Sequence, residues 1–311
     1  MQSRGVEQLQ QKSINYGYLM VTISSLGFGT LGLWAKWGYQ AGFTPLSLLV
    51  IRFGIASGLL WLLVLHRYRR IPWPGKRGAV QLVVHGGVLY ALTAGCMFQG
   101  LKLLPAGLAS MLFYLHPVST TLLAALLWHE HTSQRQLIAL AAAVLGTALL
   151  AGGAFSGSLS FSGVAFVLIA AMTYSGFTLN GQRTKQLGSP LVTCAYTTTG
   201  CFLSLLLWTR PNLAWFLQLS AKQWGIGFGV ASLGTVIGIM LFLSGVAIIG
   251  ASQTATIAAL EPLSGVLFSL LFLGEHLSGT QLLGIISILG SVAILTVRRP
   301  RAKNAAANVQ A

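Results

Sequence analysis

The chain has 311 residues, of which 54% are hydrophobic and only 7% are charged, with a mean hydropathy of +0.74. Soluble domains carry about 25% charged residues, so water is not the solvent for most of this surface. The formal net charge is +15, but Lys and Arg form short clusters between apolar runs, which argues against a nucleic-acid-binding domain. The three cysteines lie inside apolar runs and give neither a disulfide framework nor a CxxC metal spacing.

Apolar runs recur along the chain and predict membrane-spanning helices. A helix needs about 20 residues to cross the hydrocarbon core, and breaks at charges, Gly and Pro divide the sequence into ten runs. The resulting fold class is an all-α membrane protein with ten transmembrane helices. We expect the helices at residues 15–36, 46–66, 79–100, 106–128, 135–152, 162–182, 190–209, 223–245, 251–273 and 279–297.

The placement of Lys and Arg predicts the orientation of these helices. Basic residues are retained on the cytoplasmic side of a membrane. If the N-terminus is cytoplasmic, most of the 19 Lys and Arg residues fall in cytoplasmic segments, including the cluster at residues 67–77 and the end of the chain after residue 297. The other side holds mainly Lys36, Lys102, Arg210 and Lys222. We therefore expect both chain termini inside.

Two stretches of the chain resemble each other at a fixed offset of 145 residues. Residues 112–133 read LFYLHPVSTTLLAALLWHEHTS, and residues 257–278 read IAALEPLSGVLFSLLFLGEHLS. Shared Leu is expected from composition, but shared Pro, Glu and His at one offset indicate an internal repeat. The matching pairs include Pro117/Pro262, Ser119/Ser264, Glu130/Glu275, His131/His276 and Ser133/Ser278.

The repeat predicts two units of opposite orientation in the membrane. Each unit holds five helices, and because five is odd, the second unit enters the membrane from the other side. We expect a first repeat at residues 1–152, a second, inverted repeat at 153–297 and a basic cytoplasmic tail at 298–311. Inverted repeats of this kind are typical of secondary transporters, whose substrate site lies near the midplane between the repeats. A duplicated scaffold without transport is the alternative.

The repeated segments resemble those of a known superfamily. A proline-centred helix followed by a GE or HE step, as in LEPLSGVLFSLLFLGEHLSGTQLLGIISILG, and the segment RFGIASG from Arg52 are similar to the drug/metabolite transporter superfamily, and most closely to its EamA-type exporters. Length and aromatic content resemble the YddG-like branch of aromatic amino acid exporters. The resemblance implies a ten-helix exporter of the bacterial inner membrane, with helices five and ten at the periphery. The WHEHT step of the first repeat departs from the usual GE step.

Prolines and charges inside the predicted spans mark candidate gating residues. A helix proline removes one backbone donor, and in lipid the freed carbonyl needs a partner, so Pro117 and Pro262 should face the interior. Each proline is either a fixed kink or a hinge. Glu261 is the only acid well inside a span, and Arg52 is the only deep basic residue. Because a charge at mid-membrane is costly, we expect Arg52 to pair with Glu261 or with backbone carbonyls, and Glu261 otherwise to take up a proton or a substrate ammonium group.

Further candidates are polar and aromatic residues of the predicted spans. His116 is the repeat mate of Glu261 and titrates near neutral pH, so the pair is a candidate centre of the pathway. Aromatic side chains that converge on one cavity could stack a planar or hydrophobic substrate, although each aromatic alone is more often a packing or headgroup-level residue. The substrate-binding candidates are Trp34, His85, Tyr90, Tyr114, His116, Tyr174, Thr178, Asn180 and Glu261.

Other classes of protein lack their sequence signatures here. There is no HExxH, GxSxG or paired-acid motif for an enzyme and no GK[ST] step for a phosphate loop. The HEH sequence at 129–131 is a poor metal site because adjacent residues point in different directions on a helix. One unmatched Glu and one Arg fit a gated site better than an open channel. We expect an exporter of amino acids or similar amphipathic metabolites, with a lipid bilayer and a small-molecule substrate as partners, no cofactor or metal, no nucleic acid, and a monomeric state.

Overall fold

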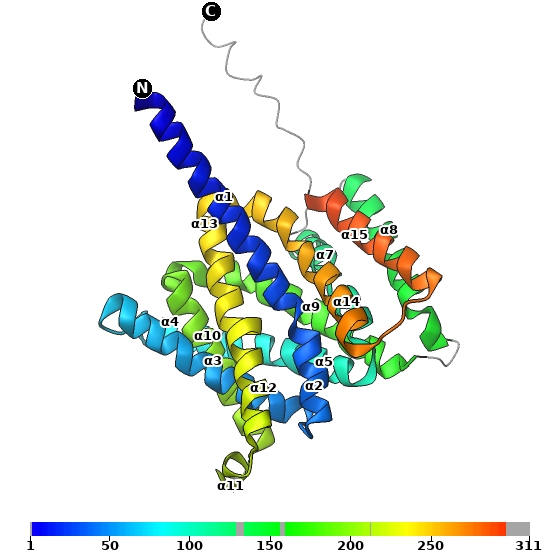
Figure 1. Ribbon diagram of the computed structural model, residues 1–311, viewed down its shortest axis with the longest axis horizontal. Coiled ribbons are helices and arrows are strands. Elements are labelled where there is room, and N and C mark those ends of the chain that lie inside the picture. Colours follow the sequence, from blue (N-terminus) through cyan, green and yellow to red (C-terminus); the bar gives the residue numbers. More distant parts are fainter. Residues whose placement is uncertain (1, 129–133, 156–158, 212, 297–311) are drawn as a thin grey trace, which may run out of the picture.

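The computed structural model of the protein describes residues 2–128, 134–155, 159–211 and 213–296, and all regular structure in these ranges is helical (Figure 1). The Glu130-His131 step and the basic tail at 298–311 lie outside the described residues. The first half of the chain contains α1 Gln2–Gly29, α2 Leu31–Gln40, α3 Pro45–Tyr68, α4 Gly75–Val84, the π-helix η1 His85–Tyr90, α5 Ala91–Leu103, α6 Ala106–Phe113, α7 His116–Trp128 and α8 Gln134–Phe155. The second half contains α9 Phe161–Thr184, the short η2 Lys185–Leu187, α10 Pro190–Thr209, α11 Leu213–Leu217, α12 Ala221–Ala231, the π-helix η3 Ser232–Ile237, α13 Gly238–Ala258, α14 Leu260–Leu273 and α15 Gly279–Thr296.

Every predicted apolar run is helical over most of its length where the structure describes it. Seven helical stretches in the described ranges are long and apolar enough to cross a membrane. Three further apolar helices are shorter: Gln136–Leu150, Leu260–Leu273 and Gly279–Ile294. These three coincide with the predicted fifth, ninth and tenth spans.

Local sequence explains where several helices begin and end. Thr44 precedes α3 and forms a capping box with Ser47, while Pro45 occupies the first turn, where its missing N–H is harmless. Ser220 and Gln223 form the same reciprocal box before α12. Gly274 ends α14 in the left-handed conformation, with φ of 63°, which glycine adopts without steric penalty.

Several predicted helices are interrupted, and the interruptions recur in the two halves. The first predicted span is divided at Thr30, between α1 and α2. The fourth is divided at Tyr114, between α6 and α7, and Ala259 interrupts the corresponding helix 145 residues later, between α13 and α14. The π-helices η1 and η3 likewise occupy the third helix of each half. A kink or a hinge was expected at Pro117 and Pro262, and each division there follows from the missing backbone donor of the proline. The division at Thr30 and the two π-helices were not expected.

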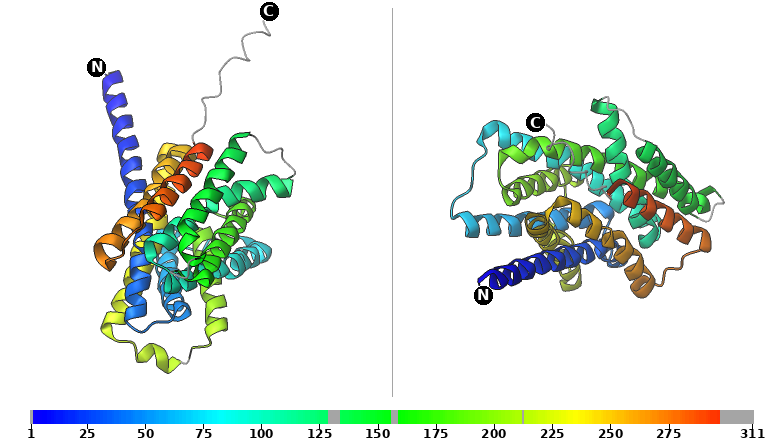
Figure 2. Two further views of the ribbon diagram at one scale, coloured as in Figure 1. Left: turned by 90° about the vertical axis from the view of Figure 1, so that its right-hand side faces the viewer. Right: turned by 90° about the horizontal axis from the view of Figure 1, so that it is seen from above.

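The bundle is arranged so that the two halves interleave. The helix α1 runs beside α13 (Figure 1), and α14 packs against α1 and α6. Figure 2 gives two further views of this bundle. The helices α3 and α10 pack together, as do α5 and α9. At one side of the bundle α8 packs against α15, where the Ser287 hydroxyl donates to the carbonyl of Ala142 over 2.7 Å. This pair at one side agrees with the peripheral position that the family resemblance implies.

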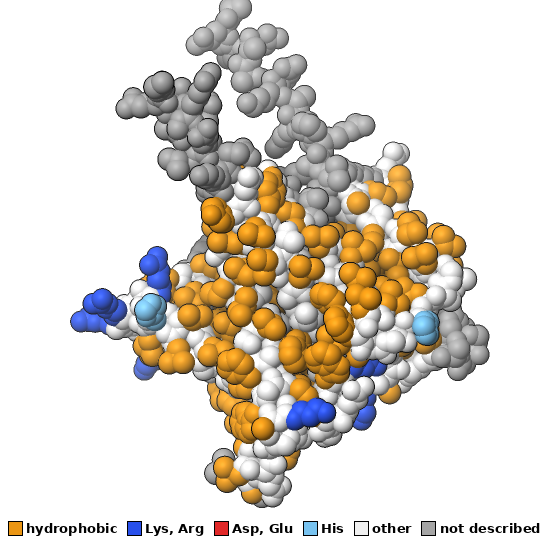
Figure 3. Space-filling view, viewed as in Figure 1, with side chains coloured by type: hydrophobic (Ala, Val, Ile, Leu, Met, Phe, Trp, Pro, Cys, Tyr) orange, Lys and Arg blue, Asp and Glu red, His pale blue; other side chains and the backbone are white. Residues whose placement is uncertain are grey.

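The outer surface of the bundle is hydrophobic. Figure 3 shows a face covered by apolar side chains, with the visible Lys and Arg side chains near its edges. Large side chains are exposed here: Leu207 is 72% exposed and Leu271 is 66% exposed. In water such patches would drive association, whereas in a bilayer they contact lipid tails. The surface is therefore that of a membrane-embedded bundle.

Candidate functional site

A cavity of about 520 Å³ lies inside the bundle. It is lined by residues from α1, α2, α3, η1, α5 and α6 of the first half and from α9, α10, α13 and α14 of the second half. Ligand pockets in proteins typically enclose about 300–1,000 Å³. The cavity is thus of a size to enclose a small molecule, and both halves of the chain build its wall.

Stacked aromatic rings form part of this wall. The ring of Phe177 on α9 stacks on His85 with centroids 4.3 Å apart and on Tyr90 with centroids 5.0 Å apart. Tyr174, one helical turn before Phe177, stacks on it at 5.8 Å. The π-helix η1 begins with His85 and ends with Tyr90, so this local widening of the helix places both rings against α9. We call these four residues the aromatic stack.

A neighbouring amide fixes the imidazole in this stack. The Nδ2 atom of Asn180 lies 3.0 Å from Nδ1 of His85. If the amide donates this hydrogen bond, the imidazole proton is on Nε2. Asn180 is not among the residues that line the cavity, so it acts on the site by orienting His85.

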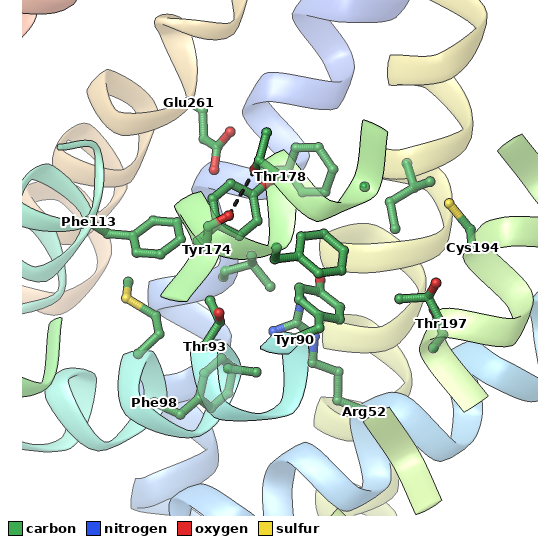
Figure 4. Close-up of a pocket in the computed structure, with 18 of the residues that line it drawn as sticks. Arg52, Tyr90, Thr93, Phe98, Phe113, Tyr174, Thr178, Cys194, Thr197 and Glu261 are labelled. Carbon is green, nitrogen blue, oxygen red and sulfur yellow. Dashed lines mark hydrogen bonds between the residues drawn. The ribbon is translucent and has the colours of Figure 1, made fainter. Parts of the chain in front are cut away.

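Glu261 supplies the only carboxyl group among the described residues that line the cavity. It lies in the first turn of α14, where the helix dipole favours a negative charge. Figure 4 shows the carboxyl group directed toward Tyr174 and Thr178. Among the described residues, its two carboxyl oxygens have no hydrogen-bond or ion-pair partner, whereas its backbone carbonyl accepts from the Ser264 hydroxyl over 2.8 Å.

Arg52 is buried beside the same cavity, but its guanidinium is engaged elsewhere. Its Nε donates to the hydroxyl of Thr235 over 3.0 Å, and one Nη donates to the carbonyl of Gly234 over 3.4 Å. The guanidinium carbon lies 4.9 Å from the ring centroid of Phe53 and 5.4 Å from that of Phe98, a favourable cation–π geometry. From the sequence we expected Arg52 to pair with Glu261 or with backbone carbonyls. Among the described residues, Arg52 pairs with a backbone carbonyl and not with Glu261.

The structure brings most of the predicted site residues to the cavity. Trp34 does not line it: its ring packs edge-on against Trp37 at 5.4 Å, and its buried Nε1 has no partner among the described residues. His116 lies behind the wall, with its ring 4.7 Å from that of Tyr174. Like Asn180 and His116, Pro117 is absent from the lining. The predicted residues that do line the cavity are Arg52, His85, Tyr90, Tyr114, Tyr174, Thr178, Glu261 and Pro262.

Sequence reasoning missed Phe177, the centre of the aromatic stack. It lies one turn after the predicted residue Tyr174 on α9 and next to the predicted residue Thr178. The three-residue spacing from Tyr174 could have indicated Phe177, but a Phe in a membrane-spanning helix is equally typical of a lipid-facing side chain. Phe113, which also lines the cavity and packs against Tyr174 at 5.4 Å, was missed for the same reason.

Packed side chains and polar contacts lie at one end of the cavity. Leu101, Leu104 and Ala106 are buried there. The Nζ of Lys36 donates to the carbonyl of Leu104 over 2.6 Å, and the carboxylate of Glu275 accepts from the first two amides of α6. The exposed Thr178 lies toward the opposite end of α9. Interhelical contacts therefore pack the Leu104 end of the bundle.

Comparison with known proteins identifies the family. The model of the EamA-like transporter family matches residues 15–152 and again 161–297. The chain belongs to the EamA-like transporter family. This membership confirms the resemblance read from the repeated proline segments, and with the apolar helices it makes the chain a multi-pass membrane protein.

Relatives with transporter names cover nearly the whole chain. The uncharacterized transporter YcbK of Bacillus subtilis is 28% identical over 90% of this chain and 93% of its own length. An uncharacterized transporter of Archaeoglobus fulgidus is 24% identical over 91% of this chain and 97% of its own length. A solved crystal structure with 19% identity covers 90% of this chain and 96% of its own, with a TM-score of 0.59, a likeness that shows the fold alone. The family and these names indicate a transporter, and a bacterial inner membrane is consistent with the relatives.

Proposed function

We propose that this protein is a secondary transporter that exports amino acids, aromatic or hydrophobic ones first, or similar amphipathic metabolites. The observation that carries the proposal is the cavity of about 520 Å³ between the two family-matched segments, which combines stacked rings with one carboxyl group. Stacked rings bind planar or apolar side chains, and a carboxyl group binds an ammonium group. Family membership supports transport as such; the choice of substrate is argued from the cavity.

The proposed architecture is ten spans in two inverted repeats, at residues 1–152 and 153–297, with a basic cytoplasmic tail at 298–311. The interruptions at Tyr114 and Ala259, 145 residues apart, support equivalent units. Both termini then lie in the cytoplasm. Tags at the two ends that report opposite sides of the membrane would overturn this topology.

Alternating access follows from this arrangement. Interhelical contacts pack the Leu104 end of the bundle, which is the outer end in the proposed orientation. Rocking of one repeat against the other opens this end and closes the Thr178 end. Pro117 and Pro262 are the proposed hinges, since each follows a helix interruption. Glu261 and its repeat mate His116, whose ring lies 4.7 Å from that of Tyr174, are the proposed centre of the pathway.

Purified protein in liposomes tests this function. Labelled amino acids are screened for uptake and counterflow, with and without a pH gradient. We expect saturable transport of at least one aromatic or hydrophobic amino acid, and no transport in protein-free vesicles. Transport only of unrelated drugs or metabolites would replace the substrate class, and chemical conversion of a substrate in detergent, without a gradient, would favour an enzyme.

A further inference from the structure

We propose that the cavity binds the ammonium group of its substrate at Glu261 and accommodates a carboxylate poorly, so that it prefers an aromatic amine to the amino acid with the same side chain. The inference rests on the proposed transport function and specifies its substrate class. It assigns the ammonium group to Glu261 and the aromatic body to the stack around Phe177.

The position of Glu261 supports the first assignment. Its carboxyl group is directed into the cavity, toward Tyr174 and Thr178 (Figure 4), and no described residue pairs with it. A carboxylate within the bilayer needs a partner of opposite charge or water. A substrate ammonium group supplies that charge at the one place in the described lining where an acid is found.

The aromatic wall favours the same charge. The faces of Phe and Tyr rings carry negative electrostatic potential and attract cations, quaternary ammonium groups included. Tyr174 presents its ring below the Glu261 carboxyl group, and Phe113 lies 5.4 Å from Tyr174 between centroids. A cation at this position meets a carboxylate on one side and π-faces on the other, while a substrate carboxylate meets repulsion from both.

The basic groups of the described lining are partly engaged by the protein itself. Two nitrogens of the Arg52 guanidinium donate to Thr235 and Gly234, neither of which lines the cavity. The ring of His85 is held by Asn180 at Nδ1 and covered by Phe177 at a centroid distance of 4.3 Å. The Arg52 side chain is only 5% exposed, so a carboxylate would have to reach its remaining N–H donors in a buried position. The amino acid therefore binds through its ammonium group, with its carboxylate poorly accommodated.

Three compounds with one aromatic body test the inference. They are 2-phenylethylamine, phenylalanine and 3-phenylpropanoate, which carry respectively an ammonium group, both groups, and a carboxylate alone. Binding to the detergent-purified protein is measured by titration calorimetry. We expect the amine to bind at least tenfold more tightly than phenylalanine, and 3-phenylpropanoate to show no binding. Phenylethyl-trimethylammonium, whose fixed charge prevents passive leakage, gives the matching transport measurement in liposomes.

Variants show whether the carboxyl group of Glu261 is responsible for the preference for the amine. Glu261→Gln should lower amine affinity at least tenfold, whereas Glu261→Asp, which keeps the carboxylate, should lower it less. Glu275→Gln, which removes an acid outside the cavity lining, should leave the tenfold preference in place. The wild-type ranking stands as a test even if Glu261→Gln fails to fold.

The outcomes separate this inference from the transport proposal. If phenylalanine binds as well as or better than the amine, or if folded Glu261→Gln keeps full amine affinity, the ammonium assignment is wrong while transport stands. If neither the three compounds nor any amino acid of the wider screen is bound or moved by the folded wild-type protein, the proposed function itself fails.

Discussion

The carboxylate of Glu275 accepts a hydrogen bond from the backbone N–H of Ala106, with an oxygen–nitrogen distance of 2.6 Å, and its second oxygen lies 3.0 Å from the amide of Gly107. Both amides are unpaired donors at the start of α6, so the charge also meets the positive end of the helix dipole. Glu275 follows α14, which carries Glu261, while α6 leads to Phe113 and Tyr114. The contact thus ties the two halves together at the Leu104 end of the bundle.

We predict that Glu275→Gln destabilises the bundle. The amide group can accept only one of the two bonds and lacks the charge, so the expected loss is about 1 kcal/mol for a half-exposed, charge-assisted contact. Thermal unfolding in detergent measures this change. The neighbouring His276→Asn is the control, because His276 is exposed; equal unfolding temperatures of the two variants would contradict the proposed contribution of the contact.

The Arg52–Thr235 bond yields a second prediction, for Thr235→Val. Valine has nearly the shape of threonine but no acceptor, so the buried guanidinium Nε loses its 3.0 Å partner. Leaving a buried charged donor unpaired costs about 1–3 kcal/mol or more. Thr209→Val is the matched control, since the Thr209 hydroxyl bonds only to the carbonyl of Leu205 in its own helix. Thermal unfolding should rank Thr235→Val below Thr209→Val, and the reverse order would show that Arg52 does not depend on this hydroxyl.

Composition and the repeat predicted the larger features of this protein. Hydropathy located the apolar helices, and the spans predicted to begin at residues 46 and 190 begin in the structure at Pro45 and Pro190. The 145-residue offset placed Pro262 and Glu261 at the corresponding helix interruption, and Glu261 lines the cavity. These features are encoded locally, in runs and motifs that need no knowledge of packing.

The missed features depend on packing between helices. No proline in the sequence indicates the π-helices η1 and η3, and their wider turns are set by the helices against which they pack. The sequence analysis placed Trp34 in the cavity, which it does not line, and did not single out Phe177, which does. The cavity side of a helix was hard to identify because a membrane helix is apolar on both its lipid and its protein sides. The usual contrast between an apolar and a polar face, which locates buried positions in soluble helices, is therefore absent.

Close backbone packing around the cavity gives a third prediction, for Gly86→Ala. A β-carbon at Gly86 would collide with the carbonyl of Thr197 on α10, and one at Gly200 would collide with the carbonyl of Val83. Helices in membranes approach closely through small residues, and backbone cannot move aside as a side chain can. We expect Gly86→Ala to lose about 1–3 kcal/mol by overpacking.

Gly95→Ala, nine residues along the same span, is the control for this prediction. Nothing lies within 4 Å of its added β-carbon, so the change should be neutral or should stabilise the helix by about 0.5–1 kcal/mol. Both variants are compared by thermal unfolding and by retained transport. If Gly86→Ala unfolds at or above the temperature of Gly95→Ala, η1 and α10 are not packed as closely as described.

The last prediction concerns Phe177, whose ring joins His85, Tyr90 and Tyr174 in the aromatic stack. Removing the ring in Phe177→Ala deletes the contacts of all three neighbours, and aromatic pairs contribute about 0.5–1.5 kcal/mol each beyond the area that they bury. Affinity for an aromatic substrate should therefore fall about threefold to tenfold. Titration calorimetry measures this change with whichever of the three phenyl compounds binds the wild-type protein. Phe177→Leu keeps most of the volume and should fall in between, because it restores packing without a π-face. Phe272→Ala removes an exposed ring on α14 that does not line the cavity and should leave affinity unchanged. An equal loss in Phe177→Ala and Phe272→Ala would mean that the stack supports the fold without contacting substrate.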